Sequence, residues 1–97
     1  SFSWDPYIAE FNLSNPDVSK VDLKFLFNLS DDALPVIDKH KNKLRGYYYP
    51  DFRTQIYSLD ELEQRKIKFF EKQGRYTWLS WNLEDSKINR YFEEQKE

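Results

Sequence analysis

The chain has 97 residues, of which 39% are hydrophobic, 19% aromatic and 33% charged, and its net charge is −2. It has no cysteine and a single histidine, His40, which excludes a disulfide framework, a thiolate metal site and a multi-histidine metal centre. No apolar run approaches the roughly 18 residues of a membrane span, and the aromatic content argues against disorder. We therefore expect a single globular domain over residues 1–97, complete or cut from a longer protein. We expect it to be intracellular (cytoplasmic or nuclear), with no membrane contact.

Two segments near the N-terminus alternate between apolar and polar residues. Residues 7–13 alternate first, and residues 21–29 do so more regularly, with five apolar side chains on one face. Alternation with period two is typical of a half-buried strand. The turn-forming residues between the segments, around Pro16, predict that the two strands form an antiparallel hairpin.

A helix is expected between Asp32 and Gly46. Acidic residues at its start provide an N-cap, lysines cluster near its end, and Gly46 is a natural left-handed stop. An extended segment or short strand should follow at residues 47–50, because Pro50 restricts the residue before it. The composition of residues 54–57 favours a strand.

The second helix is the most distinct in the sequence. Ser58 and Glu61 have the spacing of a capping box, the apolar residues that follow recur at helical spacing, and Gly74 should end the helix. Residues 75–81 have apolar side chains on both faces of a predicted internal strand. Asn82 should then cap a last helix.

The predicted order of elements is therefore β-β-α-β-α-β-α. A hairpin followed by two helical crossovers gives an α+β domain. Its mixed sheet begins with the N-terminal antiparallel hairpin, and the helices pack on the sheet.

Signals of enzymatic activity are weak, so we expect no catalysis, no cofactor and no metal. His40 lies among lysines, whose charge would keep it neutral. The two glycines of the chain are both expected at helix ends, so they cannot form a phosphate-binding loop. A metal-dependent hydrolase using Asp51 and Glu61 is the least favoured hypothesis, because Glu61 is already explained by its place in the first turn of a helix.

Charge is distributed in three blocks along the chain. Residues 1–38 carry a net −5, residues 39–75 a net +5, and residues 76–97 a net −2. Two interpretations remain open. The acidic ends could fold against the basic middle and cancel its field, or the middle could form a basic face for an anionic partner.

Residues 39–57 combine basic and aromatic side chains. The candidate ligand-binding residues are Lys41, Lys43, Arg45, Tyr47, Tyr48, Tyr49 and Arg53. Basic groups that meet phosphates beside rings that stack on bases are typical of a protein that binds single-stranded nucleic acid. The competing interpretation is that some of these tyrosines belong to the core and that the lysines form the solvated side of a helix.

Trp78 and Trp81 are candidates for a protein interface, because tryptophan is enriched at binding hot spots. Tryptophan is also a common core anchor, and we expect at least one of the two to be buried. The function that the sequence favours is a non-enzymatic protein–protein interaction module or a small subunit of a larger assembly. The alternative is binding of RNA or single-stranded DNA through residues 39–57.

Overall fold

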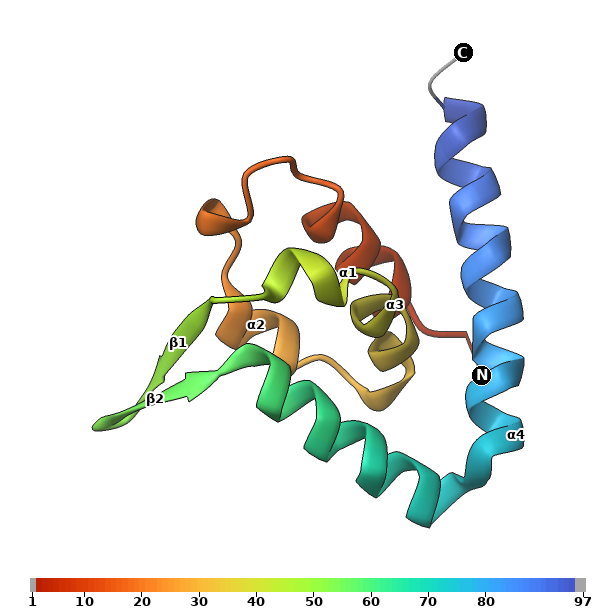
Figure 1. Ribbon diagram of the computed structural model, residues 1–97. Coiled ribbons are helices and arrows are strands. Elements are labelled where there is room, and N and C mark those ends of the chain that lie inside the picture. The colour runs from red at the N-terminus through yellow and green to blue at the C-terminus, as the bar shows by residue number, and fades with distance from the viewer. Residues whose placement is uncertain (1, 96–97) are drawn as a thin grey trace.

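The structure is a computed structural model that describes the backbone of residues 2–95 and, within that range, the side chains of all residues except 82–89 and 91–93. The elements in chain order are α1 (Asp5–Leu13), η1 (Val18–Lys20), α2 (Leu23–Phe27), η2 (Asp31–Ala33), α3 (Leu34–Lys39), η3 (Lys41–Leu44), β1 (Tyr48–Asp51), β2 (Thr54–Tyr57) and α4 (Ser58–Gln95). Figure 1 shows the short helices gathered into one body, with the β1–β2 hairpin at one end. Helix α4 is bent into two arms, which lie along two sides of this body.

The predicted mixed sheet is wrong. In residues 2–95 the only sheet is the antiparallel pair β1–β2, and neither N-terminal segment is a strand. Residues 7–13 lie in α1, and α2 occupies the centre of residues 21–29. In residues 21–29 the apolar pattern fits both the two-residue period of a strand and the 3.6-residue period of a helix. Leu23, Leu26 and Phe27 are buried at helical spacing, whereas Phe25 is exposed. The Asp22 carboxylate accepts a hydrogen bond from the backbone N–H of Phe25 and caps α2, which favours the helix.

The predicted strand at residues 75–81 is also wrong, because these residues belong to the second arm of α4. The apolar residues of this segment, which would lie on both faces of a strand, are also compatible with a helix. In the helix, Trp78 and Trp81 lie about one turn apart. Asn82 therefore lies inside a helix rather than at its start. The arms meet at Gly74, whose φ of 83° and ψ of 163° are open almost exclusively to glycine. The helix predicted from Ser58 to this glycine is confirmed.

The predictions for the middle of the chain are confirmed in part. The segment between Asp32 and Gly46 is helical but is divided among η2, α3 and η3, and Gly46 has the expected positive φ of 85°. The segments at 47–50 and 54–57 form the hairpin. The hydroxyl of Ser58 is fully buried, 2.9 Å from the carbonyl oxygen of Leu44 and 2.8 Å from that of Tyr47. Ser58 therefore joins the start of α4 to η3 and β1.

The core lies where α3 packs against α1 and the first arm of α4. At the corner between the two arms, the buried ring of Phe69 has the rings of Trp78 and Trp81 at centroid distances of 5.3 and 4.8 Å, both edge to face. Edge-to-face pairs add to the stability gained from burial. These contacts fix the second arm against the first.

Candidate functional site: the tyrosine hairpin

The hairpin has a two-residue turn and a stacked tyrosine pair. Tyr48 lies opposite Tyr57, and Asp51 lies opposite Thr54, so Phe52 and Arg53 form the turn. The rings of Tyr48 and Tyr57 stack with centroids 4.8 Å apart. The hydroxyl of Tyr57 accepts a hydrogen bond from the backbone N–H of Gly46 at 3.1 Å. The base of the hairpin is thus tied to the end of η3.

Tyr49 points to the opposite face of the hairpin and is part of the core. Its ring stacks on Phe27 with centroids 5.5 Å apart. Burial, together with the negative charge of Glu61, raises the pKa of the Tyr49 hydroxyl to about 12. Tyr49 therefore remains protonated at neutral pH.

Phe52 stands at the tip of the hairpin with 97% of its surface exposed. Its φ is 56°, and Phe52 is the only described residue other than glycine with a positive φ. A positive φ at the first turn position is the pattern of a type II′ hairpin turn, where glycine is the usual residue. A side chain with a Cβ in this region costs roughly 1–2 kcal/mol. Neither core packing nor backbone preference therefore explains a phenylalanine here.

Lys24, from α2, lies beside the tip. Its ammonium group is 5.7 Å from the centre of the Phe52 ring and 3.7 Å from the Asp51 carboxylate. The pair with Asp51 offsets the charge of Lys24. The guanidinium of Arg53 has no ion pair within the described residues, so the tip presents one aromatic ring and one unbalanced positive charge.

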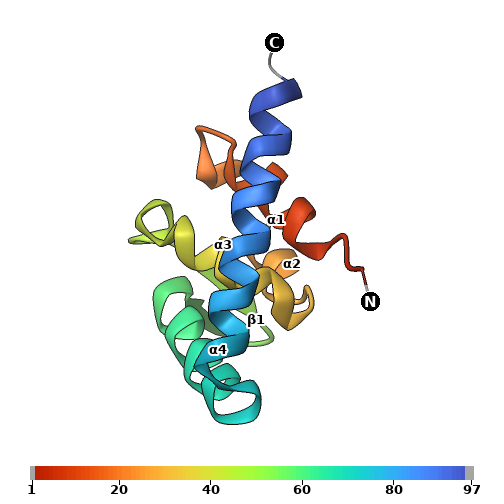
Figure 2. The ribbon, with the colours of Figure 1, turned by 90° about the vertical axis from the view of Figure 1, so that its right-hand side faces the viewer.

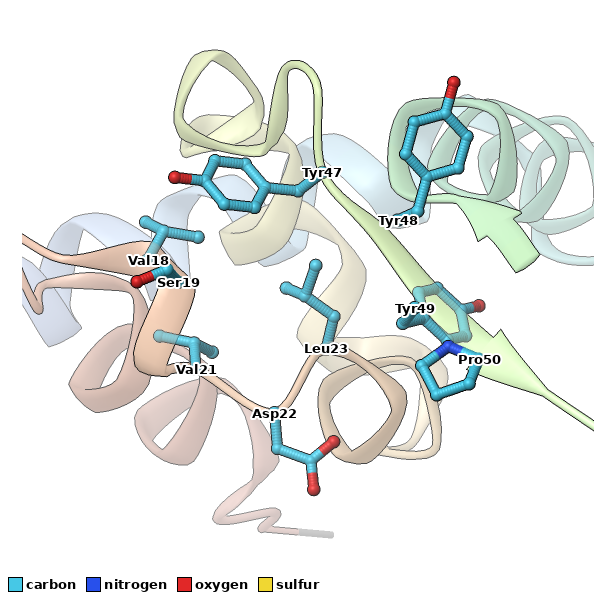
Figure 3. Close-up of a pocket in the computed structure, with 9 residues that line it drawn as sticks. All are labelled: Val18, Ser19, Val21, Asp22, Leu23, Tyr47, Tyr48, Tyr49 and Pro50. Carbon is cyan, nitrogen blue, oxygen red and sulfur yellow. The ribbon is translucent and has the colours of Figure 1, made fainter.

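A groove of about 180 Å³ runs along the outer edge of β1. It is lined by Val18, Ser19, Val21, Asp22, Leu23, Tyr47, Tyr48, Tyr49 and Pro50. Figure 3 shows Tyr47 above Val18 and Leu23, whereas the ring of Tyr48 points away from the groove. Small-molecule pockets usually measure roughly 300–1,000 Å³, so this groove is of a size for one or two side chains of a protein partner.

A second groove, of about 130 Å³, lies between α2, the hairpin and the first arm of α4. Both carboxylates of the hydrolase hypothesis line it, but each is paired, Asp51 with Lys24 and Glu61 with Arg65 at 2.9 Å. Among the described residues, no three His, Cys, Asp or Glu side chains form a group that could hold a metal ion. The charges of this groove are thus engaged with one another.

The structure separates the candidate residues of segment 39–57. Lys41, Arg45, Tyr47 and Tyr48 are exposed near the base of the hairpin, and Arg53 is at its tip. The ammonium group of Lys43 donates to the carbonyl oxygen of Leu13 at 2.6 Å and so extends along the end of α1. The segment therefore does not form one continuous basic face.

The candidates for a protein interface lie inside the molecule or near its surface at the corner of α4. Trp78 is buried, as expected for at least one of the two tryptophans, and Trp81 is partly buried. Phe52 is one of the aromatic residues of segment 39–57 but was not singled out as a ligand-binding residue. The signal that could have identified it is its position between two predicted strands, where the turn offers no partner for an aromatic ring.

A buried acidic residue also escaped the sequence analysis. Glu10, from α1, accepts a hydrogen bond from Lys39 and lies 2.7 Å from the imidazole Nε2 of His40. Burial alone would raise the pKa of this carboxyl group, but the hydrogen bonds and charges of His40 and Lys39 outweigh it and lower the pKa to about 2. The three side chains join α1 to the end of α3.

No protein-family model, no curated protein and no solved structure matches this chain. Within the described residues, no helix has both the length and the apolar composition that crossing a membrane requires. The chemistry of the hairpin and its two grooves is therefore the basis on which a function is proposed.

Proposed function

We propose that this chain is a non-enzymatic protein–protein interaction module, a domain or small subunit of a larger assembly, that binds its partner through the hairpin. The observation that carries the proposal is Phe52, which is 97% exposed and has a φ of 56°. A backbone outlier that local packing does not explain is a reason to infer a functional role.

The energetics favour a binding role for this ring. Burying a phenylalanine side chain contributes roughly 1.5–3 kcal/mol, and the isolated chain forgoes this at Phe52. A partner with an apolar pocket would recover it. Such buried aromatic anchors contribute most of the affinity in protein interfaces.

Charge and groove size support a protein partner as well. Arg53, next to Phe52 and without an ion pair in the described residues, favours a pocket with an acidic rim. The groove along β1, at about 180 Å³, is of a size for a side chain next to the anchor. These features together fit a protein surface better than a cofactor or a metabolite.

The test uses the wild type and two variants as bait in an affinity capture. Each captured partner is then purified, and its binding to the three proteins is measured by calorimetry. Phe52→Gly removes the ring and, because glycine suits the turn, should not lower the free energy of unfolding. Tyr76→Ala is the control, since Tyr76 is 84% exposed on the second arm of α4, away from the hairpin. We expect a partner that binds the wild type and Tyr76→Ala equally and binds Phe52→Gly at least about 30-fold more weakly, the loss typical of a hot spot. Partners that all bind Phe52→Gly as tightly as the wild type would contradict the proposal.

Binding of single-stranded RNA or DNA is the second candidate. The observation in its favour is that two tyrosines and two basic residues, Tyr47, Tyr48, Lys41 and Arg45, are exposed near η3. Against it, Tyr48 already stacks on Tyr57, and Tyr49 is buried.

The two candidates differ in their response to substitution and salt. If nucleic acid binds near η3, anisotropy of labelled oligonucleotides should show micromolar binding that weakens steeply with salt. Arg45→Glu should then reduce binding, Lys72→Glu on α4 should have little effect, and Phe52→Gly should have none. An absence of binding at low salt would eliminate this candidate.

A further inference from the structure

The outer face of α1 carries a row of apolar side chains that we call the aromatic stripe. Trp4, Tyr7, Ile8 and Phe11 follow one another at i, i+3, i+4 and i+7, and Phe2 precedes them. This spacing places the four on one side of a helix. Phe2, Trp4 and Phe11 are 68%, 66% and 71% exposed.

The opposite face of the same helix belongs to the core. Ala9 and Leu13 are fully buried, and α1 packs against α3. Figure 2 shows α1 at the outside of the body, beside the second arm of α4. On the outer face, Tyr7 and Ile8 are half-buried, whereas Phe2, Trp4 and Phe11 remain largely exposed. These three rings are the part of the aromatic stripe that has little cover.

Three of the rings in the stripe already pack against one another. The ring centroid of Trp4 is 4.9 Å from that of Phe2 and 5.6 Å from that of Tyr7, both edge to face. A cluster that is assembled before binding loses little conformational entropy when it binds. The aromatic rings of the stripe are therefore preorganised for contact with another surface.

The charges around the stripe indicate what kind of surface covers it. Residues 2–19 contain no lysine and no arginine. The Asp5 carboxylate accepts a hydrogen bond from the backbone N–H of Ser30 at 2.8 Å, and Glu10 is buried with Lys39 and His40. An anionic lipid surface or a nucleic acid needs basic residues, and residues 2–19 supply none. A second copy of the same stripe fits, because a two-fold axis brings its uncharged rings against each other.

The area of the stripe fits a weak dimer. Each aromatic side chain buries roughly 150–250 Å² when fully covered, so three rings that are about two-thirds exposed offer roughly 300–500 Å² per copy. The pair would bury roughly 600–1,000 Å² from these rings alone, which is below the roughly 1,200 Å² of stable specific interfaces and within the range of weak, transient ones. An interface of this size is expected in a reversible dimer rather than a permanent one.

We propose that two copies of this chain associate through the aromatic stripe, with the α1 helices facing each other across a two-fold axis. This inference goes beyond the proposed function, because it uses the side of α1 rather than the hairpin. The hairpins remain free to bind the partner, so the dimer would present two binding sites.

Sedimentation velocity tests the proposal with the protein alone. We expect the sedimentation coefficient of the wild type to rise from the monomer to the dimer value between about 1 µM and about 1 mM. Phe11→Glu, at an exposed position, should stay monomeric over this range. Tyr76→Glu, an equally exposed aromatic outside the stripe, should dimerise as the wild type does. A wild type that stays monomeric throughout, or a Phe11→Glu variant that still dimerises, would overturn the proposal.

A second measurement uses the absence of cysteine from the chain. Ser14→Cys places one thiol at the exposed end of α1, and Glu71→Cys places one on α4 as the control. The rate at which a thiol reagent labels Ser14→Cys should fall as the protein concentration rises through the range of dimerisation, whereas the rate for Glu71→Cys should stay constant. A constant labelling rate at position 14 would count against this interface. Because Phe52→Gly should dimerise normally, failure of the dimer and failure of the hairpin proposal give different results.

Discussion

Replacing Glu10 with glutamine should remove the charge that holds α1 against the end of α3. The glutamine side chain has nearly the same shape, so the substitution tests electrostatics rather than packing. In the wild type, Lys39 and His40 both contact the Glu10 carboxylate, which is buried. Glu10→Gln removes the negative charge that both side chains contact.

The size of the effect follows from the pKa. The contacts with His40 and Lys39 lower the pKa of Glu10 from its ordinary 4.5 to about 2, despite the opposing effect of burial. Each tenfold change in proton affinity is worth about 1.36 kcal/mol, so the folded state favours the ionised form by about 3 kcal/mol. Because the pKa is lower in the folded state, this stability is fully present above pH 4.5 and is lost as the pH falls through about 2.

Urea unfolding at a series of pH values between about 7 and about 2 measures this contribution. Tryptophan fluorescence reports on unfolding, since Trp78 and Trp81 pack on Phe69. We expect Glu10→Gln to be less stable than the wild type by about 3 kcal/mol at pH 7, with the difference closing towards pH 2. Glu71→Gln, at an exposed position on α4, should follow the wild type. A constant difference between Glu10→Gln and the wild type across this range would refute the electrostatic explanation.

Three further predictions concern stability and are checked by urea or thermal unfolding. Gly74→Ala should destabilise the fold by about 1–3 kcal/mol, because the φ and ψ at this position suit only glycine; no loss would show that the bend lies elsewhere. Ser58→Ala should cost about 1–2 kcal/mol by removing a buried hydroxyl that donates its single hydrogen between two carbonyl oxygens, whereas Ser80→Ala, at an exposed position, should change little. Phe69→Ala should cost about 3–5 kcal/mol because it opens a cavity between the arms of α4, and a loss no larger than that of Tyr76→Ala would argue against this packing.

The parts of the fold that could be predicted from sequence are those with a local cause. Gly46 and Gly74 end or bend helices because a positive φ is easily reached only without a side chain, and both have it. The helix that begins at Ser58 has apolar residues at regular helical spacing and was recognised from them. The two short strands of the hairpin were predicted from Pro50 and from the composition of residues 54–57.

The predicted secondary structure was wrong where one apolar pattern fits both a strand and a helix. Residues 21–29 alternate as a strand does, but Leu26 breaks the alternation, and the buried residues Leu23, Leu26 and Phe27 have the i, i+3, i+4 spacing of one helix face. Residues 75–81 fit a strand buried on both faces equally well. The aromatic ring of Phe69, on the other arm of α4, provides the surface on which Trp78 and Trp81 pack as a helix.

The candidate site also has some features with a local cause in the sequence and others that depend on tertiary packing. Three consecutive tyrosines mark the hairpin in the sequence, but only the ring of Phe27 beneath β1 decides that Tyr49 is buried and Tyr48 is exposed. Glu10 and His40 are 30 residues apart, so their contact depends on how α1 and α3 pack. No local sequence pattern indicates that two residues so far apart in the chain are in contact.

By itself, the sequence determined what the chain lacks and where its helices stop. It excludes disulfides and thiolate metal sites by composition, and it sets turns and helix ends through glycine, proline and capping residues, whose effects extend over only a few positions. The tertiary structure alone decided which period each apolar segment adopts, which aromatic rings are covered, and that Phe52 and the rings of Phe2, Trp4 and Phe11 remain exposed. The physical reason is that burial depends on a second surface, and that surface comes from residues distant in the chain.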